Sequence, residues 1–252
     1  MIVNGSWTEA LERSAISDAW LLGDGYFETI RTYGNKPFAL ERHLNRLNRA
    51  LLASGNPGLE LDLVKNSVAE LMERSGHESG RLRIIVGSDG NWLATHDPYS
   101  PAKKGLACAL VSWDHELSRG GKRNSYGSRF ELRRSAQAAG LDDAILVRDA
   151  RVIVEATTCN LIVRIDGSWM TPNLESGCLP GITRAFLIEE FGVVEREILR
   201  ADLTKAEAVA LTSSLREIQS VESIDGILLP SSNLVARLAD DFHSWILGNL
   251  GA

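Results

Sequence analysis

The stretch CLPGITR at residues 178–184 runs directly into AFLIEEFG at 185–192, which has apolar residues at helical spacing. Pro180 and Gly181 stand at the start of this expected helix, and Thr183 lies within its first turn. Because the first four N–H groups of a helix have no partner inside it, such an entry offers several donors to an anion. A turn shaped by Pro and Gly and capped by Thr183 is the simpler alternative. The stretch alone leaves both interpretations open.

Composition limits what kind of protein this is. The chain has 252 residues, 44% of them hydrophobic, which is enough to fill the core of one large domain or two smaller ones. Its net charge of −6 argues against broad binding to nucleic acid or anionic membranes. No apolar run approaches the ~20 residues that span a bilayer, and the N-terminal sequence lacks the pattern of a signal peptide. We therefore expect a cytoplasmic protein with no nucleic-acid or membrane partner.

The cysteines and histidines give no sign of a disulfide or metal framework. Cys108, Cys159 and Cys178 are scattered and odd in number, which is typical of reduced thiols. The histidines form no H-x-x-x-H pair and no cluster with cysteine, so we expect no metal site. Any anion site must therefore be built from a few placed side chains and backbone N–H groups.

The hydrophobic pattern predicts an α+β chain in two parts. Strand patterns over 1–5, 25–34 and 81–90 flank helical patterns over 38–55 and 63–76. A polar, Gly-rich passage follows, and it divides the chain into an N-terminal domain at 1–110, a connection at 111–121 and a C-terminal domain at 122–252. For the second part we expect helices and strands over 130–140, 143–149, 151–156, 159–167, 208–215 and 233–252, besides the helix entered through 178–184.

The usual nucleotide-phosphate loops are missing. GDGYFE at 23–28 begins like a dinucleotide fingerprint but lacks the third Gly and leads into a strand pattern. No G-x-x-x-x-G-K-[ST] occurs. An anion site in this chain must take a different form.

Four isolated polar residues together suggest one cofactor. Singly, Arg46 could be a solvated helix charge, Lys122 a loop charge, Glu155 an outward residue of a half-buried strand, and Thr183 a cap. Pyridoxal 5′-phosphate needs a Lys amine for its Schiff base, an acid on its pyridine nitrogen, and a cationic or helix-terminal phosphate site. The four residues match those needs.

The chain resembles the class IV, or fold-type IV, pyridoxal-phosphate enzymes. The resemblance covers nearly the whole length in six ordered blocks: GDGYFETIR, FALERHLNRL, KRNSYGSRFELRRSAQAAGLDDAILV, VIVEATTCNLIV, MTPNLESGCLPGITR and ALTSSLREIQSVESIDG. It implies an α+β fold with a smaller N-terminal α/β domain and a larger C-terminal α/β pseudo-barrel domain. It also implies pyridoxal 5′-phosphate as cofactor, a small-molecule amino substrate and a homodimer.

The same resemblance assigns roles to individual residues. Arg46 takes the position of the phosphate-binding Arg, Lys122 that of the Schiff-base Lys, and Glu155 that of the acid on the pyridine nitrogen. Ile182 and Thr183 take the positions of the phosphate-binding residues at the helix start.

Three further positions match the family less closely. Tyr126 would contact the ring hydroxyl, but Ser125 stands beside it where many relatives have Asn, and Gly127 where they have an apolar residue. Ser213 and Ser214 lie in a segment that often holds phosphate or substrate.

The resemblance includes three reactions: transamination of branched-chain amino acids, transamination of D-amino acids, and the 4-amino-4-deoxychorismate lyase reaction of folate synthesis. Thr29 in FETIR, the segment TSSLREIQSV and the short chain favour the lyase, which forms p-aminobenzoate and pyruvate. Lys122 would take the proton from the carbon bearing nitrogen, and Thr29 would donate a hydrogen bond to the departing ether oxygen. A class IV aminotransferase is the alternative. A non-catalytic cofactor-binding relative, or a plain α+β binding protein, is the alternative from another class.

Overall fold

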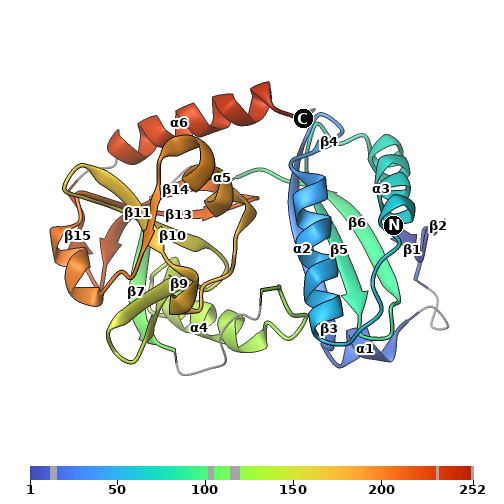
Figure 1. Ribbon diagram of the computed structural model, residues 1–252, viewed down its shortest axis with the longest axis horizontal. Helices are drawn as coiled ribbons and strands as arrows, with labels where there is room; N and C mark the ends of the chain where they lie inside the picture. Colours follow the sequence, from blue (N-terminus) through green and yellow to red (C-terminus); the bar gives the residue numbers. More distant parts are fainter. Residues whose placement is uncertain (12–15, 102–104, 114–119, 231–232, 251–252) are drawn as a thin grey trace. The chain divides into compact units, whose positions relative to one another are not determined.

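The computed structural model describes residues 1–11, 16–101, 105–113, 120–230 and 233–250, which form two compact units (Figure 1). The first unit holds the described residues within Met1–Pro101, Gly120–Tyr126 and Asn249–Ala252. The second holds 105–113 and Gly127–Gly248. Each unit contains one β-sheet with its own hydrophobic core. The α+β prediction is confirmed.

The units are bounded differently from the expected domains at 1–110 and 122–252. Strand β7, Leu106–Ser112, belongs to the second unit because it forms parallel ladders with two of that unit's strands. Residues 120–126 belong to the first unit because their backbone hydrogen-bonds to strand β3, Gly25–Tyr33. Of the expected connection at 111–121, residues 114–119 lie outside the described part of the chain.

The sheet of the first unit is antiparallel throughout, with strand order β2-β1-β6-β5-β3-β4. Its strands are β1 (Ile2–Val3), β2 (Ser6–Trp7), β3 (Gly25–Tyr33), β4 (Lys36–Pro37), β5 (Ser79–Gly87) and β6 (Trp92–Pro98). Its helices are α1 (Asp18–Leu21), α2 (Leu40–Ala53) and α3 (Leu61–Ser75).

Helix α2 packs on this sheet through one apolar face. Leu44, Leu47 and Leu51 recur at helical spacing and are buried together with Ile30 of β3. Because side chains alternate along a strand, β3 directs Tyr26, Glu28 and Ile30 to this core and Phe27, Thr29 and Arg31 to the opposite side. The two faces of β3 therefore carry different groups.

The sheet of the second unit mixes parallel and antiparallel pairs in the order β12-β11-β10-β13-β14-β7-β8-β9, with β15 added beside β14. Its strands besides β7 are β8 (Asp143–Arg148), β9 (Val152–Ala156), β10 (Asn160–Ile165), β11 (Ser168–Pro172), β12 (Val194–Arg196), β13 (Ala208–Ser213), β14 (Glu217–Ile224) and β15 (Ile227–Leu228). Its core consists of the Ile, Leu and Val side chains of these strands.

Three α-helices and two 3₁₀ turns accompany this sheet: α4 (Gly127–Ala138), α5 (Ile182–Phe191), α6 (Asn233–Gly248), η2 (Leu174–Ser176) and η3 (Arg200–Lys205). Helix α5 begins after Gly181 and ends at Gly192, whose φ of 66° suits a residue without a Cβ. The helix expected after CLPGITR is confirmed. Among the described residues, no helix is both long and apolar enough to cross a bilayer.

Candidate active site

The expected site residues divide between the two units. Arg46, Lys122, Tyr126 and Thr29 lie in the first unit, whereas the second unit contains Glu155, Ile182, Thr183, Ser213 and Ser214. Each group is described within its own unit.

Lys122 lies in a segment that is bound to the start of β3. The N–H of Phe27 donates to the Lys122 carbonyl at 2.8 Å, and the N–H of Asn124 donates to the Gly25 carbonyl at 2.9 Å. This close approach requires Gly25, which has φ 140° and at which a Cβ would lie 2.0 Å from the Val86 carbonyl oxygen. The backbone at Lys122 is therefore fixed against the sheet.

The Lys122 side chain and Tyr126 meet at Phe27. The Lys122 Nζ lies 5.7 Å from the centre of the Phe27 ring, and the Tyr126 ring meets the same ring edge-on at 5.3 Å. Phe27 and Thr29 lie on one face of β3, and their Cα atoms are separated by about 7 Å along the strand. The first unit thus brings Lys122, Tyr126 and Thr29 to one side of its sheet.

Arg46 lies on the other side of β3, in a buried cluster. Its Nε and Nη2 donate to the two carboxylate oxygens of Glu28 at 2.8 and 2.6 Å, and His43 Nδ1 lies 2.7 Å from Glu28 Oε2. Burial strongly opposes the ionisation of Glu28, but the charges and hydrogen bonds of Arg46 and His43 together outweigh it and hold the pKa of Glu28 well below its usual range. Arg46 is 3% exposed, so it is not a solvated helix charge.

Three arginines share the face of Thr29, and we call Arg31, Arg81 and Arg83 the arginine face. Thr29 is the sheet partner of Arg83, and Arg31 is the partner of Arg81. Arg81 pairs with Asp97 at 3.1 Å, whereas the buried Nε of Arg83 has no hydrogen-bond partner among the described residues. Burial and the charge of Arg81 lower the pKa of Arg83. This face suits negatively charged groups.

In the second unit, Glu155 is 3% exposed in the fully buried strand β9, so it is not an outward residue. Its Oε2 accepts hydrogen bonds at 3.1 Å from Asn160 Nδ2 and from the Leu179 N–H. Its Oε1 accepts no hydrogen bond from the described residues. One carboxylate oxygen is thus anchored, and the other retains capacity for a donor.

A residue that the sequence analysis did not select lies beside that second oxygen. Arg129 Nη1 is 2.8 Å from Glu155 Oε1, close enough for an ion pair but not aligned for a hydrogen bond. Arg129 also lies over the ring of Trp113 at 5.0 Å. A glutamate expected inside a buried strand was the available signal, because a buried carboxylate requires a nearby cation or several donors.

The start of α5 has the donors that its sequence predicts. Its N-cap is Gly181, so no side chain caps its first N–H groups. Thr183 is buried in the first turn, and its Oγ1 has no hydrogen-bond partner among the described residues. The capping alternative for Thr183 is therefore wrong. Ile182 contributes its backbone N–H at the first helical position.

Asn160 links this helix start to Glu155. Its Nδ2 donates both to Glu155 and to the Leu179 carbonyl, the latter at 2.8 Å, and a Cβ at Gly181 would lie 1.8 Å from its Oδ1. Its sheet partner is Thr212, whose buried Oγ1 also has no partner among the described residues. The second unit therefore places two unsatisfied hydroxyls near the residues that hold Glu155.

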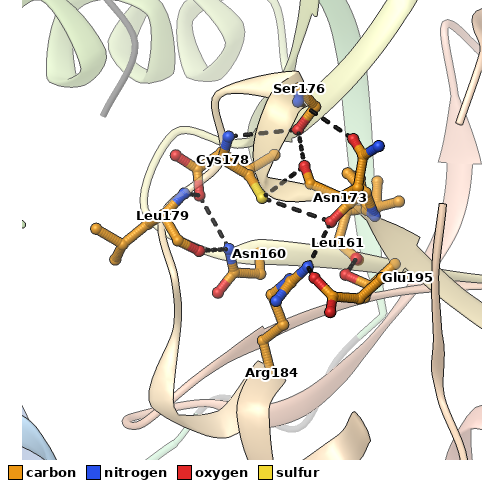
Figure 2. A network of polar contacts seen from close by, with 11 residues as sticks. Asn160, Leu161, Asn173, Ser176, Cys178, Leu179, Arg184 and Glu195 are labelled. Atoms are coloured by element: carbon orange, nitrogen blue, oxygen red, sulfur yellow. Dashed lines mark hydrogen bonds and ion pairs between the residues drawn. The ribbon is translucent and has the colours of Figure 1, made fainter. Parts of the chain in front are cut away.

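Two further side chains, those of Arg184 in α5 and Ser213 in β13, hydrogen-bond to the backbone. Arg184 donates to the Pro172 carbonyl at 2.7 Å and pairs with Glu195 (Figure 2). Ser213 Oγ accepts the Arg216 N–H at 3.2 Å and so stabilises a turn, in which Ser214 also lies.

The residues present fit pyridoxal phosphate. The helix N–H groups of α5 and the Thr183 and Thr212 hydroxyls could bind an anion, and Glu155 Oε1 could accept a donor such as a protonated ring nitrogen. A Lys amine such as that of Lys122 could bind an aldehyde. The described residues contain no group of three or more His, Cys, Asp or Glu side chains that could hold a metal ion. The individual roles of the site residues remain predictions.

The comparisons with known proteins agree with this chemistry. The family model for amino-transferase class IV matches residues 25–224. A provisionally named branched-chain-amino-acid aminotransferase of Methanocaldococcus jannaschii is 26% identical, over 89% of this chain and 87% of that protein. The aminodeoxychorismate lyase of Bacillus subtilis is 28% identical, over 89% and 86% of the two chains.

A solved structure has the same fold. The crystal structure of a provisionally named 4-amino-4-deoxychorismate lyase from Legionella pneumophila has a TM-score of 0.84 and 26% identity, and the match covers 91% of this chain and 94% of that one. The expected fold type is confirmed. The chain belongs to the amino-transferase class IV family of pyridoxal-phosphate-dependent enzymes.

Proposed function

We propose that this protein is an aminodeoxychorismate lyase, which forms p-aminobenzoate and pyruvate for folate synthesis. The observation that carries the proposal is the position of Thr29. It is buried on the face of β3 that also bears Phe27, over which the Lys122 amine lies. A hydroxyl near that amine can assist the departure of an ether oxygen, which transamination does not need.

The arginine face supports a substrate with two carboxylates. Aminodeoxychorismate carries one carboxylate on its ring and one on its enolpyruvyl group. Arg83 is the sheet partner of Thr29, and its buried Nε has no hydrogen-bond partner among the described residues. Guanidinium groups bind carboxylates with defined geometry, so a dicarboxylate fits this face better than valine or D-alanine does.

The residues of the chain would divide the chemistry between them. Bound pyridoxal phosphate supplies an electron sink for the charge left when the carbon bearing the amino group loses its proton. The Lys122 amine accepts that proton, and Thr29 donates a hydrogen bond to the departing oxygen. Glu155 holds a proton at the ring nitrogen, while Thr183 and the first N–H groups of α5 bind the phosphate.

Arg46 is also proposed to bind the phosphate, and its pairing with Glu28 decides how this is tested. Arg46→Ala would leave the Glu28 carboxylate buried without its cation, which destabilises the fold whatever Arg46 binds. Arg46→Lys keeps the charge but not the bidentate geometry. We expect it to weaken cofactor binding more than it lowers the stability of the cofactor-free protein.

A class IV aminotransferase is the second candidate, since the Methanocaldococcus relative bears that name. The arginine face would then bind the two carboxylates of a dicarboxylic amino acid. The test supplies the cofactor-loaded protein either with aminodeoxychorismate, followed by chromatography of p-aminobenzoate, or with amino and keto acid pairs. We expect p-aminobenzoate to form faster than any amino group is transferred. Efficient transamination without p-aminobenzoate would establish the second candidate, and neither activity would indicate a non-catalytic relative.

A further inference from the structure

Arg129 has surroundings that fix both its position and its charge. It lies in the first turn of α4 and is 7% exposed. The Trp113 ring covers its guanidinium, Nη1 lies 2.8 Å from Glu155 Oε1, and the Thr157 carbonyl is 3.5 Å from Nη1. A buried guanidinium of this kind stays charged and has few alternative orientations.

Packing alone does not account for the pair of Arg129 and Glu155. Taking two charges out of water is unfavourable, and apolar residues of similar volume often stabilise a core as well or better. Leu146 and Val154 already pack against Trp113 in this core. The chemistry of Glu155 therefore explains the ion pair better than packing does.

Glu155 has its two oxygens in different states. Asn160 and the Leu179 N–H hold Oε2, so the carboxylate cannot rotate freely. Oε1 faces the Arg129 charge but accepts no hydrogen bond from the described residues. A further donor can therefore bind Oε1 without displacing any hydrogen bond.

We propose that Arg129 is a positioning residue that keeps the proton shared between Glu155 and the cofactor on the ring nitrogen instead of on the carboxylate. A proton on the Glu155 carboxylate would lie closer to the Arg129 guanidinium than the same proton on a ring nitrogen bound to that carboxylate. The cation therefore repels the proton from Glu155 more strongly than from the ring. At an effective dielectric constant of about 20, moving a proton ~2 Å farther from such a charge changes the ratio of ring-bound to carboxylate-bound proton about tenfold.

This inference rests on the proposed role of Glu155 but not on the choice between lyase and aminotransferase. It gives Arg129 a task in either reaction, because both need the ring as an electron sink. A merely structural Arg129 would affect folding and leave the location of the proton unchanged.

The experiment uses the full chain loaded with pyridoxal phosphate labelled with ¹⁵N at the ring, without substrate. The ¹⁵N chemical shift distinguishes a protonated ring nitrogen from an unprotonated one. In Arg129→Gln, which keeps a polar group but loses the charge, we expect the ratio of protonated to unprotonated ring to fall about tenfold. Arg129→Lys should restore most of the wild-type shift. Arg134→Gln, an exposed change of the same kind on the same helix, should leave it unaltered.

Glu155→Gln distinguishes a failure of the proposed role of Glu155 from a failure of the role inferred for Arg129. If it leaves the ring nitrogen as in the wild type, Glu155 is not the ring acid, and the inference fails together with that role. If Glu155→Gln changes the shift and Arg129→Gln does not, only the role of Arg129 is overturned. Should Arg129→Gln not fold, Arg129→Met, which keeps the apolar stem, takes its place with the same expected result. A variant that unfolds more easily but keeps the wild-type shift would show Arg129 to be structural.

Discussion

Both units contain a buried glutamate that pairs with an arginine, Glu28 with Arg46 and Glu155 with Arg129, and the two pairs differ in how many hydrogen bonds the carboxylate accepts. In the first unit, both oxygens of Glu28 accept hydrogen bonds from Arg46, and His43 lies within hydrogen-bond distance as well. In the second unit, Glu155 Oε2 accepts two hydrogen bonds, whereas within the described part of the chain Oε1 has only the unaligned charge of Arg129 beside it. The first carboxylate is saturated and the second is not.

The difference separates two uses of a buried charge. A saturated carboxylate ties two elements together, here β3 and α2, and has little left for a ligand. An unsatisfied buried oxygen costs stability, so it persists where a further donor is expected. The same reasoning applies to the hydroxyls of Thr183 and Thr212, which lie in the same unit as Glu155.

Lys122 gives the largest expected effect, because the first unit would supply the reactive amine from the face of β3 opposite its saturated pair. Lys122→Ala should abolish the covalent adduct that borohydride traps, while the fold stays intact because the backbone contacts of residue 122 remain. Mass spectrometry of the reduced protein measures the adduct. Lys205→Ala, on η3 of the second unit, is the control and should retain it. An adduct that survives in Lys122→Ala would assign the Schiff base to another lysine.

The contrast between the carboxylates is tested directly by Glu28→Gln and Glu155→Gln in the cofactor-free protein. Glu28→Gln leaves the Arg46 charge buried without its partner and should cost about 3–5 kcal/mol in urea unfolding. Glu155→Gln should cost less, because Arg129 still has the Trp113 ring and the Thr157 carbonyl. Equal losses would remove the distinction between the two pairs.

The same pair gives a dependence on pH. The folded-state pKa of Glu28 is held below its ordinary value of 4.5, so its contribution is present above that value and is lost as pH falls toward the folded-state pKa. Acid should therefore reduce the difference in unfolding free energy between the wild type and Glu28→Gln. Unfolding curves measured between neutral pH and about pH 3 should show this difference shrinking. If the difference in unfolding free energy stays constant with pH, the effect of Glu28→Gln comes from packing and not from the charge of Glu28.

The sequence predicted the elements with strong periodicity and the residues that matched a motif. The helical pattern over 63–76 became α3 and ended at Gly76 in the left-handed conformation, as its final Gly predicts. The sequence did not predict β12, because a strand of three residues has almost no pattern to detect. It also missed β14, which begins at Glu217 with a positive φ of 57° directly after a turn.

The pairings within the candidate site could not be predicted from the chain alone. Glu28 and Arg46 meet only because α2 folds back onto β3, and Arg129 reaches Glu155 only across β8, which lies beside β9 in the sheet. The hydropathy pattern does show that a glutamate lies within the apolar run of β9. Which cation approaches such a glutamate depends on tertiary structure.

Thr29 tests whether the face of β3 opposite the saturated pair carries the proposed chemistry. Thr29→Val keeps the β-branched shape that suits a strand but removes the hydroxyl, and it should slow p-aminobenzoate formation ~10²-fold, or less if water substitutes. Cofactor binding should change little, and any transaminase activity should remain. Thr29→Ser should recover most of the rate, whereas Thr29→Gly should not. Undiminished lyase activity in Thr29→Val would remove the main support for the lyase proposal.

Substitution of Thr183 should have the smallest effect on cofactor binding. It tests whether a buried hydroxyl without a hydrogen-bond partner among the described residues marks the phosphate site. Its hydroxyl has no partner in the described part of the chain, so Thr183→Val should leave the stability of the cofactor-free protein unchanged or slightly raised. Loss of one hydrogen bond to a charged phosphate should weaken cofactor binding about tenfold, measured by absorption titration. Thr171→Val is the matched control, because the buried Thr171 hydroxyl donates to the Leu161 carbonyl at 2.8 Å. That variant should lower stability by about 1–3 kcal/mol and leave cofactor affinity unchanged. If both variants lose stability equally and bind the cofactor alike, unsatisfied hydroxyls do not mark the phosphate site in this fold.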